Sequence, residues 1–184
     1  MVGCPSKPNS RSAAGNPTSA TRSRTGTSGA ARLHLTATDL AEAVRTTLAL
    51  RGWSTEVTLQ VPAPVHAAVD RRRFDVIIAN LVGNALRHGA PPVTVTLTAD
   101  PRQITVEVTD EGPGLGPDAL PRVFDRFYKA DSARTRSDGS GLGTAIALEN
   151  ARLHGGTIEA ADRDGPGAAF VLRLPTRAPE EDTP

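Results

Sequence analysis

Apolar side chains recur at helical spacing, i, i+3, i+4 and i+7, most clearly in residues 71–88. This segment should form a long helix with one buried face, which the Gly-Ala-Pro-Pro sequence after it would end. A shorter apolar stripe at 40–50 follows Asp39, whose spacing to Glu42 is that of a helix N-terminal cap. We expect a third helix over about 143–154, after a glycine-rich segment.

Apolar and polar residues alternate in several other segments, which is typical of half-buried strands. The expected strands lie at 57–61, 66–69, 93–98, 104–109, 157–161 and 168–174. Turn-forming residues between 98 and 104 predict an antiparallel hairpin. Helices that cover one face of a mixed, mostly antiparallel sheet would bury all these stripes, so the predicted fold class is an α+β two-layer sandwich.

The patterned part of the chain is predicted to be one domain, residues 38–175. Residues 1–37 are rich in Ser, Thr, Pro, Gly and Arg and have few large apolar side chains, which predicts a disordered basic leader. An organelle transit peptide has a similar composition but also an amphipathic stripe, which this leader lacks, so a linker or a trimmed upstream region fits better. Residues 176–184 are predicted to be a mobile acidic tail.

Composition argues against several classes of function. The net charge is +1, but five of the 21 basic residues and none of the 20 acidic ones lie in residues 1–38. The remainder is therefore mildly acidic, which argues against a general surface for binding nucleic acid. No apolar stretch approaches the roughly 18–20 residues of a membrane span, and no secretory signal is present, so we expect a cytoplasmic protein without membrane contact. The single cysteine, Cys4, excludes an internal disulfide and a Cys/His zinc site.

Two glycine-rich segments, 110–116 (DEGPGLG) and 139–143 (GSGLG), allow the backbone to approach a ligand closely, although glycines in such turns are as often structural. The second precedes a helix N-terminus, whose free N–H groups favour an anion. The lysine-bearing phosphate loop is missing. A Rossmann dinucleotide site is disfavoured, because GSGLG follows a charged loop rather than a strand.

The helix at 71–88 carries Asn80, Asn84, Arg87 and His88 on one face. Two amides one turn apart can offer oxygens to a hard cation, and a guanidinium nearby can neutralise phosphate oxygens. The alternative is that the asparagines cap neighbouring turns and that the basic pair is a solvated helix end. Taken alone, this face favours the second interpretation, because asparagine on a helix surface is ordinary.

Four segments in this order resemble the N, G1, F and G2 boxes of the sensor histidine kinase catalytic domain. They are NLVGNALRH (80–88), DEGPGLG (110–116), VFDRFYKAD (123–131) and GSGLGTAIA (139–147). The resemblance covers about residues 38–175. It implies the Bergerat ATP-binding fold, with the nucleotide between the N-box helix and a lid at residues 128–140.

The resemblance implies ATP and Mg²⁺ as ligands and a role for each matching residue. Asn84 would ligate Mg²⁺ with Asn80 supporting it, Arg87 would lie near the phosphates, and His88 would lie beside the nucleotide. Asp110 would accept the adenine amine. The remaining expected ATP-binding residues are Gly112, Gly114, Lys129, Gly139, Ser140, Gly141, Leu142, Gly143 and Thr144, and Phe124, Phe127 and Tyr128 would pack the base of the lid. Thr144 departs from the leucine common in the family.

The residue at position 80 separates this chain from other members of the superfamily. Gyrase-type ATPases and the related anti-sigma serine kinases carry glutamate there, and asparagine cannot accept a proton. No histidine here stands in the family's phosphoacceptor motif. The resemblance therefore implies an incomplete protein histidine kinase, with no catalytic residue of its own, that donates the γ-phosphoryl of Mg·ATP to a histidine on a separate dimerisation domain.

The implied partners are that dimerisation domain and, indirectly, a response regulator receiver domain; the parent kinase could itself be membrane-anchored. Two alternatives stay open. One is a nucleotide-dependent anti-sigma-like serine kinase or switch protein. The other is a truncated remnant that only binds ATP.

Overall fold

The computed structural model describes residues 33–128 and 141–176. The elements in chain order are β1 (Leu35–Asp39), α1 (Leu40–Leu50), β2 (Val57–Gln60), β3 (His66–Asp70), α2 (Arg71–His88), β4 (Val93–Ala99), β5 (Gln103–Thr109), the 3-10 helix η1 (Leu120–Arg122), α3 (Gly143–Leu153), β6 (Thr157–Asp162) and β7 (Ala168–Pro175). Most of the predicted leader, of the predicted tail and of the predicted lid lies outside the described residues.

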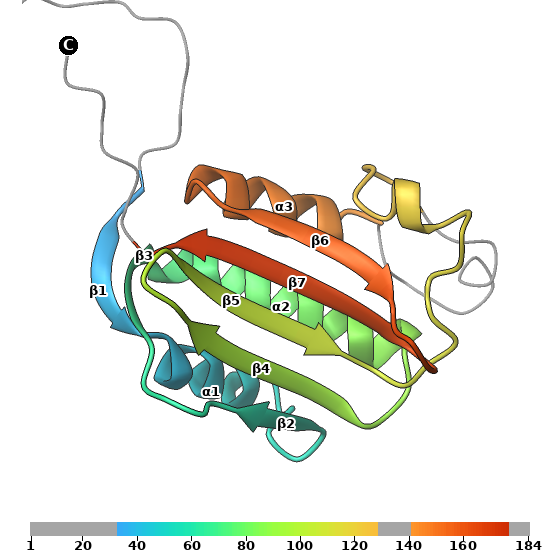
Figure 1. The fold of residues 1–184 in the computed structure, drawn as a ribbon, viewed down its shortest axis with the longest axis horizontal. Coiled ribbons are helices and arrows are strands. Elements are labelled where there is room, and N and C mark those ends of the chain that lie inside the picture. The colour runs from blue at the N-terminus through green and yellow to red at the C-terminus, as the bar shows by residue number, and fades with distance from the viewer. Residues whose placement is uncertain (1–32, 129–140, 177–184) are drawn as a thin grey trace, which may run out of the picture. The chain divides into compact units, whose positions relative to one another are not determined.

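Five strands form one sheet in the order β2-β4-β5-β7-β6. The pairing of β2 with β4 is parallel, and the other three pairings are antiparallel. The three α-helices lie on one face of this sheet (Figure 1). These observations confirm the predicted fold class, a mixed, mostly antiparallel sheet with a helical layer on one side.

The core lies between the sheet and α2. Ile104, Val106 and Val108 alternate along β5 toward the helices, and the predicted apolar face of α2 is almost fully buried, as at Phe74 and Leu81. Burying such side chains contributes about 1.5–3 kcal/mol each. No α-helix in the described ranges is long and apolar enough to cross a membrane.

The predicted β4–β5 hairpin is confirmed, and Asp100 builds its turn. The Asp100 Oδ1 atom accepts hydrogen bonds from the N–H groups of Arg102 at 2.7 Å and Gln103 at 2.8 Å. These two bonds reverse the chain in the manner of an Asx turn. The pairing then runs without a bulge from Ala99 opposite Ile104 to the far end of both strands.

The sequence analysis did not predict β1. Its residues pair antiparallel with β3 over five positions, so the predicted boundary between residues 37 and 38 falls inside a strand. Most β1 side chains are exposed and supply no apolar alternation. The strand therefore depends on its hydrogen bonds to β3, which local pattern does not encode.

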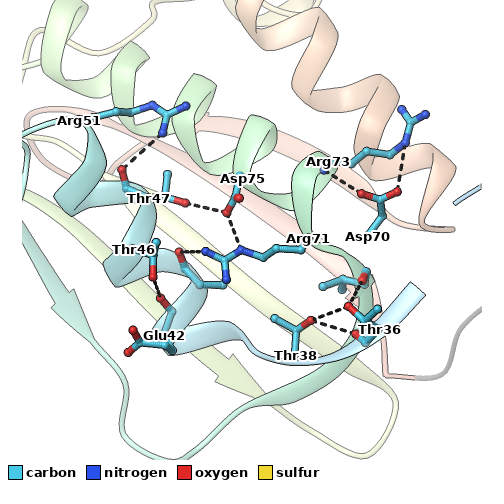
Figure 2. Close-up of polar contacts among 12 residues, drawn as sticks. Thr36, Thr38, Glu42, Thr46, Thr47, Arg51, Asp70, Arg71, Arg73 and Asp75 are labelled. Atoms are coloured by element: carbon cyan, nitrogen blue, oxygen red, sulfur yellow. Dashed lines mark hydrogen bonds and ion pairs between the residues drawn. The ribbon is translucent and has the colours of Figure 1, made fainter. Parts of the chain in front are cut away.

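A polar cluster joins α1 to α2 (Figure 2). The Arg71 Nε and the Thr47 hydroxyl both donate to Asp75 Oδ1, each at 2.8 Å. A second Arg71 nitrogen donates to the Ala43 carbonyl at 3.2 Å. Because these bonds connect the two helices, they define how α1 lies against the helix that carries the candidate site.

Asp70 caps the N-terminus of α2 and links it to distant parts of the chain. Its buried carboxylate accepts hydrogen bonds from the N–H groups of His34 at 3.1 Å and Arg73 at 3.2 Å. Its own N–H donates to the His154 ring at 3.0 Å, and the Arg73 guanidinium reaches the Asn150 side chain at 3.0 Å. Burial raises the pKa of Asp70, but these N–H bonds and the Arg73 charge outweigh burial and hold the pKa below its ordinary 3.8.

Replacing Asp70 by Ala should lower the free energy of unfolding by roughly 1–3 kcal/mol, because two backbone N–H groups lose their acceptor. Since the folded-state pKa is lowered, the carboxylate stabilises the fold above about pH 4, and this contribution is lost as the pH falls through the lowered pKa. In denaturant titrations at acidic pH, the free energy of unfolding of Asp70→Asn should therefore fall less steeply with falling pH than that of the unmodified chain. A variant whose stability declines as steeply as that of the unmodified chain would contradict this role.

Candidate functional site

The polar face of α2 meets the N-terminus of α3. Asn80 and Asn84 are half-buried, and the Asn80 Nδ2 atom donates to the Val76 carbonyl at 2.9 Å. A Cβ atom placed on Gly143 would lie 2.7 Å from Asn80 Oδ1, so the first residue of α3 packs directly on this oxygen. The amide thus binds its own helix through nitrogen and presents oxygen toward the second glycine segment.

Arg87 and His88 end the polar face. A Cβ atom on Gly83 would lie 3.3 Å from both Arg87 Nη2 and Trp53 Cη2, so the guanidinium lies back over Gly83 beside the indole. Partial burial, together with the neighbouring Arg87 charge, lowers the pKa of His88 below its ordinary 6.5. The lowered pKa favours the neutral form of His88, so Arg87 supplies the positive charge at this end of α2.

Asp110 lies against the last turn of α2. The residue is 3% exposed, and its Oδ1 atom accepts a hydrogen bond from the Gly112 N–H at 2.8 Å. A Cβ atom on Gly89 would overlap with this carboxylate, and one on Gly112 would lie 2.6 Å from the Gly89 Cα. Among the described residues, the second carboxylate oxygen has no hydrogen-bond partner, so it is available to a ligand.

Gly112 and Gly114 were expected to admit a ligand, and the structure gives each a packing role. Gly112 makes room for Gly89, while Gly114 has a φ of +80° and faces the Asp162 carboxylate, 2.7 Å from the position of a Cβ atom. These contacts support the structural interpretation of the two glycines, and their approach to a ligand stays a prediction.

The second glycine segment is joined to the segment that follows η1. Gly141 has a φ of +67°, and its carbonyl accepts a hydrogen bond from the Phe127 N–H at 2.9 Å. The Thr144 hydroxyl donates to the Val123 carbonyl at 2.5 Å. Leucine is common at this position in the family, and Thr144 makes a hydrogen bond there that leucine could not make. Lys129, Gly139 and Ser140 lie outside the described residues.

The three aromatic residues of the expected F box have different environments. Phe124 packs edge-to-face on Phe170, with 6.3 Å between ring centroids, and the Arg122 guanidinium lies 4.6 Å from the Tyr128 ring centroid. Phe127 is 71% exposed, and most of the lid whose base it was expected to pack lies outside the described residues, so that expectation stays a prediction. Its φ is +65°, which is rare for a non-glycine residue.

The structure thus brings together the polar face of α2, Asp110 and the N-terminus of α3, which lie far apart in the sequence. It also adds three residues that the sequence analysis missed, Trp53, Asp162 and Arg163. No local signal identifies them. Each acts through a tertiary contact. Trp53 lies beside Arg87, and Asp162 and Arg163 bind the segment after β5.

Comparisons with known proteins agree on one family. The family model described as histidine kinase-, DNA gyrase B- and HSP90-like ATPase matches residues 69–178. Signal transduction histidine-protein kinase AfsQ2 of Streptomyces coelicolor is 51% identical over 80% of this chain. Sensor histidine kinase MtrB of Mycobacterium tuberculosis is 41% identical over 80% of it. The chain spans only 28% and 27% of these two relatives.

Solved structures give the same result. The mycobacterial sensor histidine kinase MprB superposes with a TM-score of 0.66 at 28% identity, covering 78% of this chain and 100% of that one. Full-length ShkA, solved in complex with AMPPNP, gives a TM-score of 0.67 at 29% identity, covering 82% of this chain and 33% of that one.

Thr144→Val should lower the free energy of unfolding by about 1 kcal/mol, because the variant keeps the side-chain shape and loses the hydrogen bond to Val123. Amide hydrogen exchange in residues 120–128 should accelerate, since this bond anchors the segment to α3. Thr144→Ser, which keeps the hydroxyl, is the control. Equal stability and exchange in the valine variant and the unmodified chain would refute the anchoring role.

Proposed function

The chain belongs to the family of histidine kinase-, DNA gyrase B- and HSP90-like ATPases, and from this premise we propose that it is the ATP-binding catalytic domain of a sensor histidine kinase. In this proposal the domain binds Mg·ATP and offers the γ-phosphoryl group to a histidine on a separate dimerisation domain. The observation that supports it most is the contact of α2 with both glycine segments, at Gly89 with Asp110 and at Asn80 with Gly143.

Asp110 is proposed to recognise the base. Its buried carboxylate is oriented by the Gly112 N–H at 2.8 Å, which occupies one oxygen and leaves the other for a donor. The exocyclic amine of adenine is such a donor, whereas guanine presents a carbonyl at that position and would leave the carboxylate unpaired. The site would therefore select adenine nucleotides.

Asn84 and Asn80 are proposed to hold the metal-bearing end of the nucleotide. Amide oxygens are hard ligands of the kind that Mg²⁺ accepts, and Asn80 presents its oxygen toward the N-terminus of α3. When bound, Mg²⁺ would neutralise phosphate charge and orient the triphosphate. Gly141, Leu142, Gly143 and Thr144 would then offer the free N–H groups of the α3 N-terminus to the phosphates.

Asparagine at position 80 supports transfer to a protein acceptor over rapid hydrolysis. An amide cannot take a proton from an attacking water or from a serine hydroxyl, so position 80 supplies no general base. Catalysis would then consist of positioning and charge neutralisation. This suits an imidazole nitrogen, which can attack without first losing a proton. This disfavours the serine-kinase alternative.

Among the described residues, His154 has a ring held by structural contacts, and His88 lies at the site itself. His154 is 3% exposed, and its ring nitrogens contact the Asp70 N–H and the Asn150 carbonyl. His34 and His66 are exposed, but neither stands in the family's phosphoacceptor motif. We therefore propose that the phosphoacceptor lies on a dimerisation domain, with a response regulator as the subsequent recipient.

Titration with a fluorescent ATP analogue and Mg²⁺ should show saturable binding to the chain. Asp110→Ala and Asn84→Ala should each weaken binding by tenfold or more, roughly the loss of one charged or metal-mediated contact. Thermal unfolding should change little in Asn84→Ala, whereas Asp110→Ala also removes the acceptor of the Gly112 N–H, so a thermal melt must first show that this variant is folded. Undiminished affinity in both variants would contradict the proposed site.

Phosphate transfer is the test of the proposed reaction. The chain, incubated with radiolabelled ATP, Mg²⁺ and a histidine kinase dimerisation domain from a related protein, should place acid-labile, base-stable label on that domain and none on itself. Asn84→Ala should abolish the transfer. Acid-stable phosphoserine would support the anti-sigma-like alternative instead, and binding without any transfer would support a remnant that only binds ATP.

A further inference from the structure

The carboxylate of Asp162, the last residue of β6, is bound to the first glycine segment. Its Oδ1 atom accepts a hydrogen bond from the Leu115 N–H at 2.6 Å, and its Oδ2 atom accepts one from the Gly116 N–H at 3.1 Å. Gly114, in a left-handed conformation with a φ of +80°, leaves room for the carboxylate. One side chain therefore holds both N–H groups at the far end of this segment.

The next residue, Arg163, holds the near end of the same segment. Its Nη1 atom donates to the Asp110 carbonyl at 3.0 Å and lies 3.9 Å from a Glu111 carboxylate oxygen. Gly167, which follows in the same turn, packs on the Asp110 backbone so closely that a side chain there would overlap with it. The β6–β7 turn thus holds residues 110–116 at both ends.

We propose that Asp162 and Arg163 are positioning residues for base recognition, an inference that rests on the function proposed above. They hold residues 110–116 in the conformation that orients the Asp110 carboxylate, so the segment need not become ordered when the nucleotide binds. Preorganisation of this kind raises affinity by removing the cost of ordering. Neither residue touches the nucleotide in this proposal.

To hold the two N–H groups, Asp162 needs its negative charge and both carboxylate oxygens. An asparagine has a single acceptor oxygen, and its NH₂ group would face a backbone N–H, so donor would meet donor. Asp162 is exposed, and solvent can replace the lost bonds in the unliganded protein. The effect of the substitution should therefore appear in nucleotide affinity rather than in unfolding.

The experiment compares two ligands on the full 184-residue chain. Mg·ATP and Mg·tripolyphosphate each compete against the fluorescent ATP analogue, and only the first carries a base. Asp162→Asn should weaken Mg·ATP about three- to tenfold, the loss of one net hydrogen bond, and leave the tripolyphosphate affinity unchanged. Arg163→Ala should have the same selective effect.

Asp164→Asn is the matched control, because it makes the same chemical change two residues away in the same turn. Asp164 is exposed and has no hydrogen-bond or ion-pair partner among the described residues. This variant should bind both ligands like the unmodified chain. A thermal melt of each variant shows whether it is folded, and if Asp162→Asn is not, Arg163→Ala decides the question.

Three results would overturn the inference. Unchanged Mg·ATP affinity in the Asp162 and Arg163 variants would remove the positioning role. An equal loss for both ligands would indicate a general structural effect, as would an equal loss in the Asp164 control. If the unmodified chain does not bind Mg·ATP, the proposed function fails and the inference with it. If it binds and Asp110→Ala weakens binding while Asp162→Asn does not, the inference alone fails.

Discussion

The last turn of α2 lies directly on the segment after β5 because neither Gly89 nor Gly112 has a side chain. A Cβ atom at Gly89 would overlap with the Asp110 carboxylate, and one at Gly112 would lie 2.6 Å from the Gly89 Cα. This close approach brings the polar face of α2, which begins at Asn80, and Asp110 to the same end of the fold. This contact therefore sets how near the Asp110 carboxylate lies to the helix that carries the polar face.

The elements that carry the site differ in how firmly they are held. The long helix α2 is buried along its apolar face, and Asp70 and Arg71 connect its start to the N-terminal elements and to α3. The first glycine segment has no such core, and side chains from elsewhere hold it instead, as Asp162 does at Leu115 and Gly116. A rigid helix would thus position the metal-bearing end of the nucleotide, while a segment held by tertiary hydrogen bonds would position the base.

The sequence predicted the features that arise from local pattern. The period of apolar residues gave the limits of α2 correctly, and the turn chemistry of Asp100 gave the β4–β5 hairpin. Features that arise from tertiary contact could not be predicted. Strand β1 is held by its pairing with β3, Phe127 has a left-handed backbone that no local pattern indicates, and Asp162 looks like any residue at a strand end. The roles of Asn84 and Asp110 toward a nucleotide stay predictions.

The central claim is that Asn84 and Asp110 hold opposite ends of one magnesium-bearing adenine nucleotide. Nuclear magnetic resonance of the ¹⁵N-labelled chain tests it most directly, through the side-chain amide of Asn84 and the backbone amide of Gly112, which reports on Asp110. As Mg·ATP is added, we expect both signals to shift along a single binding curve with one midpoint, and Mg²⁺-free adenosine to shift the Gly112 signal alone. Signals that shift with different midpoints, or an Asn84 signal that does not shift, would contradict the account.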